Sequence, residues 1–290
     1  MNASIRLLRH QRPMLAAVAS IILKAIKPSK KKIIECNPEV HVKNIEISKP
    51  IMKNYHKWLG VEKRYQDRIA PHLFPLWSYP HLLKLGKALH LPLHKVLNQG
   101  CKLVIENQLP ANKPLSTHIH IYQVQNLEKK IRINQRITTG TNDFPNSITA
   151  EIYAVILKDP SQLLKKEKES KIIDTSRFEF INDVQIGKAE AQSYAYLSGD
   201  INPIHLSRRI AKRMGLKHSI MHGFGLFAIL FEKLQKYGFT IKEIDIRFLS
   251  PVYLENSIQI FVRKLSETKY NVRVLDQDHK IVHLSGEFKI

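Results

Sequence analysis

Cysteine is scarce in this sequence, and long unbroken apolar runs are absent. The 290 residues include only two cysteines, which excludes a disulfide framework and a four-cysteine zinc site. Sparse cysteine is typical of a reducing compartment, so we expect a cytoplasmic protein. No stretch reaches the roughly 18–20 consecutive apolar residues that a membrane-spanning helix requires. The sequence therefore predicts neither a disulfide-rich protein nor an integral membrane protein.

Acidic residues are few beside basic ones. The chain has 46 Lys and Arg against 25 Asp and Glu, a formal charge of +21, and its apolar fraction of 43% suffices for a buried core. Such a charge attracts nucleic acid, anionic lipid or phosphate groups. Nucleic-acid binding usually needs a motif as well. The sequence shows no zinc-finger spacing, no basic region before heptads and no aromatic RNA-binding signature, so we expect no nucleic-acid partner.

The first 34 residues contain no acid. Their apolar run, Met14 to Leu23, is too short to span a bilayer, and Lys24 and Lys27 follow it where a signal peptide would have small residues. Two interpretations stay open: a basic helix in peripheral contact with an anionic membrane through residues 1–34, or a solvated tail around a helix that packs on the body. We assign residues 1–45 to a basic N-terminal tail or surface helix.

Two stretches of the chain repeat one order of elements, a helix followed by antiparallel strands. The first, residues 46–160, is predicted to have a helix from Tyr79-Pro80 to Leu89 and strands at 101–109, 117–125, 131–139 and 148–157. The charged, low-apolar residues 161–171 form a linker. The second, residues 172–290, is predicted to have helices at 187–198, from Asn202-Pro203 and at 222–237, and strands at 242–249, 256–264, 269–275 and 280–289. This order indicates a structural duplication.

The densest pattern of chemically useful residues lies early in the second stretch. Residues 198–205 read Ser-Gly-Asp-Ile-Asn-Pro-Ile-His. Ala211, Gly215, the Met221-His222-Gly223 triplet and the run from Arg247 to Val252 follow in order. Asp-x-Asn-Pro alone is an ordinary turn and cap, and the signal is the conjunction of these elements.

These elements resemble the MaoC-like dehydratase family, which includes the (R)-specific enoyl-CoA hydratases. The resemblance covers about residues 175–290, with one departure at Glu255-Asn256, where the family usually has a Gly-Asp turn. It implies an α+β double hot-dog fold, two antiparallel sheets that each wrap around a central helix. Residues 172–290 would be the catalytic hot-dog and residues 46–160, which lack the Asp-x-Asn-Pro-x-His pattern, a degenerate one.

The resemblance also implies reversible hydration of a trans-2-enoyl thioester to an (R)-3-hydroxyacyl thioester, on acyl-CoA or acyl carrier protein, without cofactor or metal. Asp200 would activate the water, His205 would exchange the proton at the α-carbon, and Gly223 would supply an oxyanion-hole N–H. Physical chemistry is consistent with these roles. Asn202 as N-cap and Pro203 begin a helix, so Asp200 lies just before its start and His205 lies in its first turn. A glycine at a helix N-terminus leaves its N–H free to meet a developing anion.

Further residues are candidates for substrate binding or positioning. Asn202 and His222 belong to the motif, and His222 is expected to orient or pack rather than to ligate metal. Arg208, Arg209 and Arg213 either meet phosphates of CoA or carrier protein or form a solvated basic face. Neither the His218/His222 pair nor His118-x-His120 has a third ligand at recognisable spacing, so we predict no metal site.

Two other functions remain open. Hot-dog proteins also host thioesterases, although the Asp200/His205 spacing argues against hydrolysis. A non-catalytic module that binds acyl thioesters is the other alternative, and it would not need Asp200, His205 and Gly223 together. The double unit can act as a monomer or as a homodimer.

Overall fold

The computed structural model describes residues 3–26, 32–159 and 172–290. Its helices are η1 (Ile5–His10), α1 (Arg12–Ile26), α2 (Lys49–Leu59), η2 (Pro71–Leu73), α3 (Pro75–Ala88), η3 (Leu93–Lys95), α4 (Lys188–Ser198), α5 (Pro203–Leu206), α6 (Arg208–Arg213) and α7 (Gly223–Tyr237). Its strands are β1 (Glu39–Ile45), β2 (Arg68–Ile69), β3 (Val96–Ile105), β4 (Leu109–Pro110), β5 (Leu115–Asn126), β6 (Lys130–Gly140), β7 (Ile148–Leu157), β8 (Glu179–Ile186), β9 (Glu243–Phe248), β10 (Asn256–Lys264), β11 (Lys269–Asp276) and β12 (Val282–Lys289).

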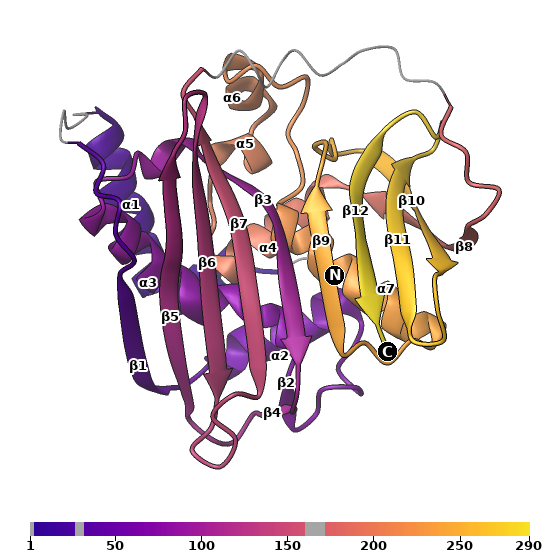
Figure 1. The fold of residues 1–290 in the computed structure, drawn as a ribbon, viewed down its shortest axis with the longest axis horizontal. Coiled ribbons are helices and arrows are strands. Elements are labelled where there is room, and N and C mark those ends of the chain that lie inside the picture. The colour runs from indigo at the N-terminus through magenta and orange to yellow at the C-terminus, as the bar shows by residue number, and fades with distance from the viewer. Residues whose placement is uncertain (1–2, 27–31, 160–171) are drawn as a thin grey trace.

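One large sheet of ten strands forms the framework of the protein (Figure 1). Its strand order is β1-β5-β6-β7-β3-β9-β12-β11-β10-β8, and every neighbouring pair is antiparallel. The first five strands come from the first half of the chain and the last five from the second. The expected pair of antiparallel sheets is confirmed, with the addition that the two join edge to edge through β3 and β9.

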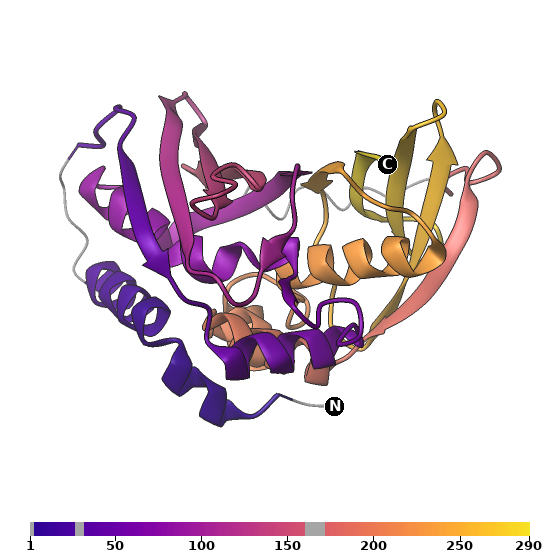
Figure 2. The same ribbon diagram turned by 90° about the horizontal axis from the view of Figure 1, so that it is seen from below.

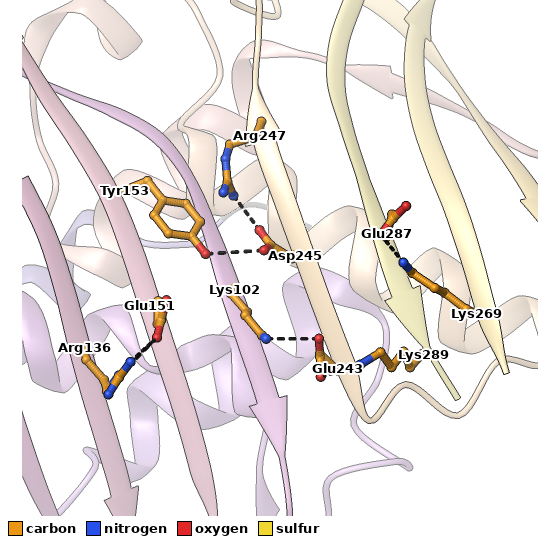
Figure 3. A network of polar contacts seen from close by, with 10 residues as sticks. All are labelled: Lys102, Arg136, Glu151, Tyr153, Glu243, Asp245, Arg247, Lys269, Glu287 and Lys289. Carbon is orange, nitrogen blue, oxygen red and sulfur yellow. Dashed lines mark hydrogen bonds and ion pairs between the residues drawn. The ribbon is translucent and has the colours of Figure 1, made fainter. Parts of the chain in front are cut away.

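The joint between β3 and β9 depends on a glycine. Gly100 pairs with Arg247, and a Cβ atom at Gly100 would lie 2.1 Å from the carbonyl oxygen of Ile246. Its φ of +147° is also one that other residues rarely adopt. On the outer face of the sheet, Lys102 pairs with Glu243 at 3.1 Å (Figure 3). The backbones of β3 and β9 therefore approach each other closely at Gly100, and a charged pair covers the outer face of this joint.

The helices lie on the opposite, concave side of the sheet (Figure 2). α7 is apolar almost all round, as a helix enclosed by a sheet must be. Phe227, Phe231 and Leu234 in α7 are fully buried. α3 takes the corresponding place in the first half, with Trp77 and Leu82 buried. Each half thus places one apolar helix against its own five strands.

Sequence patterns located most of these elements. The differences concern the start of one helix, one helix that was not predicted and the two edge strands of the sheet. α3 begins at Pro75, before the predicted start at Tyr79. β1, within the predicted tail of residues 1–45, instead pairs with β5 at the edge of the sheet. α2 and β8 were not predicted. Edge strands are buried on one side only and carry charged residues, so their apolar signal is weak.

The N-terminal segment packs on the body of the protein. The backbone N–H of Ala3 donates to Ser193 Oγ at 3.1 Å, and the Gln11 side chain donates to the carbonyl of Leu197. Met14 is buried. No helix in the described ranges has the length and apolarity to cross a bilayer. Residues 3–21 therefore match the packed-helix interpretation, while residues 27–31 lie outside the described part and membrane contact stays a prediction.

A buried carboxylate joins the two halves beneath the sheet. Glu232, in α7, accepts a hydrogen bond from Tyr65 at 2.6 Å and lies 2.8 Å from Nε2 of His72. Tyr55 Oη lies 2.9 Å from Nδ1 of His72. Burial alone would raise the pKa of Glu232, but the hydrogen bonds and charge of its partners outweigh burial and lower it. The ionised carboxylate is therefore the form that stabilises the fold.

We expect Glu232→Ala to lower the free energy of unfolding by about 3–5 kcal/mol, because it leaves His72 and Tyr65 buried without their acceptor. The wild-type contribution is present above the ordinary glutamate pKa of 4.5 and is lost as the pH falls below it. Urea unfolding at pH 7 and pH 4 measures both effects. Glu267→Ala removes an exposed pair with Lys264 and should cost less than about 1 kcal/mol. Equal costs for the two variants would contradict this prediction.

Candidate active site

A tight turn presents Asp200 at the end of α4. Gly199 caps that helix in the left-handed conformation with φ of 75°, and a Cβ on Gly199 would lie 3.0 Å from side-chain atoms of Gln11 and Met14. One carboxylate oxygen of Asp200 accepts from the backbone N–H of Asn202 at 3.3 Å. The Asn202 side chain in turn caps α5 through the N–H of Ile204. The predicted turn and cap therefore set the backbone of Asp200.

His205 lies in the first turn of α5 and is 8% exposed. Its Nδ1 is 2.9 Å from the carbonyl oxygen of Ile220. A carbonyl only accepts, so Nδ1 carries the proton and Nε2 keeps a lone pair. Burial lowers the pKa of His205, and the charge of Asp200 opposes that shift. His205 is therefore a neutral imidazole at pH 7 with a basic nitrogen available.

His222 connects these two residues. Its Nε2 donates to the backbone carbonyl of Asp200 at 2.9 Å. Its ring stacks on that of His205, with centroids 3.6 Å apart and planes 24° apart. Its pKa is well below 6.5, because of burial and then of the neighbouring His205. This position fits an orienting residue, and direct substrate binding by His222 stays a prediction.

The three side chains place their donor atoms close together. A carboxylate oxygen of Asp200 and ring nitrogens of His205 and His222 all lie within 4.8 Å of one another. Nδ1 of His222 is buried, with no hydrogen-bond partner in the described residues. A water molecule or a metal ion of suitable size could meet these atoms. The expectation of a metal-free site stays a prediction.

Gly223 begins α7 directly after His222. His222, as the N-cap residue, makes no side-chain hydrogen bond to the helix, so the first N–H groups of α7 lack an intrahelical acceptor. A Cβ at Gly223 would lie 2.9 Å from the ring of Phe248. The positive end of the α7 dipole thus follows His222, which contacts both Asp200 and His205.

An apolar cavity lies in the first half, between α3 and strands β3, β5, β6 and β7. Its volume is about 50 Å³, and its lining includes Tyr79, Leu82, Leu83, Gly86, Ile133 and Ala154. Tyr79 also packs on Phe224 of α7, with centroids 5.6 Å apart. The pKa of Tyr79 is raised by burial and by the charge of Asp200. Tyr79 therefore lines the cavity and also contacts α7, which its position before Pro80 did not reveal.

The predicted basic residues lie apart from this buried cluster. Arg208, Arg209 and Arg213 are exposed on the short helix α6. α6 follows α5 directly in the chain. Their contact with a substrate stays a prediction.

Comparison with known protein families gives a match in the second half of the chain. Residues 170–285 match the family model described as MaoC like domain. The chain contains a MaoC-like domain. Asp200, His205, His222 and Gly223 all fall inside the matched range of this domain. No curated protein matches the chain by sequence.

Three solved structures share the fold across most of this chain. HtdX of Mycobacterium tuberculosis has a TM-score of 0.70 at 14% identity, covering 87% of this chain and 100% of that one. The peroxisomal multifunctional enzyme type 2 of Drosophila melanogaster has a TM-score of 0.64 at 17% identity, covering 95% of this chain and 52% of that one. A Mycobacterium tuberculosis protein described with a double hotdog fold has a TM-score of 0.54 at 10% identity, covering 91% and 97%. The double hot-dog fold is thereby confirmed.

We expect Asp200→Asn to lower the pKa of His205 further, because the Asp200 charge is the main influence that raises it. Titration of the His205 ring protons by NMR in both proteins measures the difference. Asp183→Asn, on the distant strand β8, is the control and should leave the His205 titration unchanged. A His205 pKa that rises or stays constant in Asp200→Asn would show that the two groups do not interact.

Proposed function

We propose that this protein catalyses the reversible addition of water to a trans-2-enoyl thioester, giving an (R)-3-hydroxyacyl thioester. The observation that supports this proposal is the position of two side chains near the N-terminus of α7. Asp200 is a half-buried carboxylate, and His205 is a buried neutral imidazole. The MaoC-like domain supports the hydratase or dehydratase class. The stereochemistry and the substrate are part of the proposal.

The reaction divides among three groups. In hydration, the water oxygen bonds to the β-carbon while the Asp200 carboxylate takes a proton from the water. That proton passes to Nε2 of His205, which delivers it to the α-carbon, so both groups end in the states in which they began. In dehydration, the neutral Nε2 of His205 removes the α-proton, the proton passes to Asp200, and Asp200 gives it to the β-hydroxyl, which leaves as water. The Gly223 N–H, aided by the dipole of α7, stabilises the enolate-like thioester oxygen.

The cavity of the first half is suited to the acyl chain. Its lining is dominated by aliphatic side chains, and burial of each methylene contributes about 0.8 kcal/mol. Tyr79 lines this cavity, and the charge of Asp200 raises the pKa of its hydroxyl after burial. The half that lacks the Asp-x-Asn-Pro-x-His pattern thus serves the substrate's tail, and the other half serves its thioester. The basic residues of α6 would meet the phosphates of CoA or carrier protein.

We expect Asp200→Asn and His205→Gln each to lower the turnover number at least about 100-fold, because each removes an acid–base group. The absorbance of the enoyl thioester follows the reaction, and His218→Gln is the matched control with a near-native rate. Free thiol release without an absorbance change would indicate a thioesterase. Tight binding without turnover in the wild type would indicate a binding module. Either result would refute the proposal.

We expect Ala154→Leu to lower kcat/KM for long-chain substrates at least about 10-fold while four-carbon substrates keep near-native values, because the larger side chain fills the cavity. Ala154 is 3% exposed and lines the cavity from β7. Overpacking typically costs about 1–3 kcal/mol, so a thermal melt should accompany the assay. Ala150→Leu, equally buried on the same strand but outside the lining, is the control. An equal loss for all chain lengths would place the acyl chain elsewhere.

A further inference from the structure

Three histidines and a glutamate gather on the outer face of the sheet, far from the Asp200/His205 pair. Glu39 and His41 lie on the edge strand β1, and His118 and His120 lie on β5. In the register of the two strands, His41 faces His118 and Glu39 faces His120. Alternate residues of a strand share one face, so all four point outward from the first half. We call them the β1–β5 cluster.

Three members of the β1–β5 cluster already make close contacts. Nε2 of His118 lies 2.9 Å from Oε2 of Glu39. The rings of His41 and His118 are parallel within 2°, with centroids 4.0 Å apart. One donor atom from each of Glu39, His41 and His118 lies within 4.8 Å of the other two. The glutamate is 53% and the His118 side chain 36% exposed, so an ion can reach them from solvent.

We propose that Glu39, His41 and His118 form a surface site for a late first-row divalent cation such as Zn²⁺. Imidazole nitrogen and carboxylate oxygen are ligands of this ion, at about 2.0–2.2 Å. A tetrahedral site places its ligand atoms about 3.3 Å apart, and small rotations of the exposed rings reach that spacing. Water completes the fourth position, or His120, whose ring lies 6.1 Å from that of His118.

The surrounding charges tolerate a cation at this position. Arg136, opposite His120 on β6, donates to Glu151 at 2.8 Å and lies 5.2 Å from the centre of the Tyr122 ring. Its charge is thereby balanced on the side away from β1. Lys43 is the next outward position on β1 and adds one positive charge near that end. The carboxylate of Glu39 compensates for it directly at the donor atoms.

The location of the β1–β5 cluster suggests what a bound ion would do. β1 is one of the two edge strands of the ten-stranded sheet, and among the described residues its single strand partner is β5. An ion shared by His41 and His118 would cross-link the two strands through side chains, in addition to their backbone hydrogen bonds. Any ligand that binds the folded state alone also stabilises it. Zn²⁺ should therefore raise the melting temperature of the protein.

Calorimetric titration of the untagged full chain with Zn²⁺ tests the proposal. The group of Asp200, His205 and His222 could also bind Zn²⁺. The titration is therefore repeated in the His205→Gln variant, which removes one ligand of that second group. We expect His41→Ala and His118→Ala each to weaken one binding event at least about 100-fold, beyond the 10–100-fold typical of losing a supporting group. We expect that same event to survive in His205→Gln and in His94→Ala, an exposed histidine outside the cluster.

A thermal melt with and without Zn²⁺ provides the second readout. The Zn²⁺-induced rise should be lost in His41→Ala and His118→Ala and kept in His94→Ala, while the melts without metal report whether the variants fold. Unchanged Zn²⁺ binding in His41→Ala and His118→Ala would overturn the proposal. Loss of all Zn²⁺ binding in His205→Gln alone would assign the ion to the other cluster and overturn it as well.

Discussion

The contacts of one buried imidazole organise the candidate active site. His222 donates to the backbone carbonyl of Asp200 and stacks on the ring of His205, and Gly223 follows it in the chain. A single neutral side chain thus joins the end of α4, the start of α5 and the N-terminus of α7. Its own pKa is strongly lowered, so it stays neutral. The electrostatic field at the site therefore comes from Asp200 and from the helix dipole.

The two halves of the chain have become different while sharing one sheet. The second half holds the motif residues, and the first half holds the apolar cavity beside Tyr79. They meet through the β3–β9 joint at Gly100 on the sheet and through Glu232 beneath it. Because Glu232 lies on the same helix that begins with Gly223, partners from the first half help to hold the helix that begins beside His222.

The sequence patterns were most informative where a residue's neighbours in the chain are also its neighbours in space. Asn202, as an N-cap, and Gly199, as a left-handed cap, act within one turn, so the local order of residues 198–205 predicted their geometry. The alternation of apolar and polar residues on β5, β6 and β7 likewise follows from their local backbone. The sequence patterns did not predict β1 and β8, because edge strands bury little apolar surface.

Long-range contacts produced everything that these patterns missed. Tyr79 contacts Phe224 because α3 packs against the start of α7. Glu39 and His41 reach His118 because β1 pairs with β5 at the edge of the sheet. The amino-acid sequence by itself determined the MaoC-like motif and the caps, and it supplied the residues proposed as acid and base. The tertiary structure decided which distant side chains share their surroundings, since burial and charge depend on packing between segments far apart in the chain.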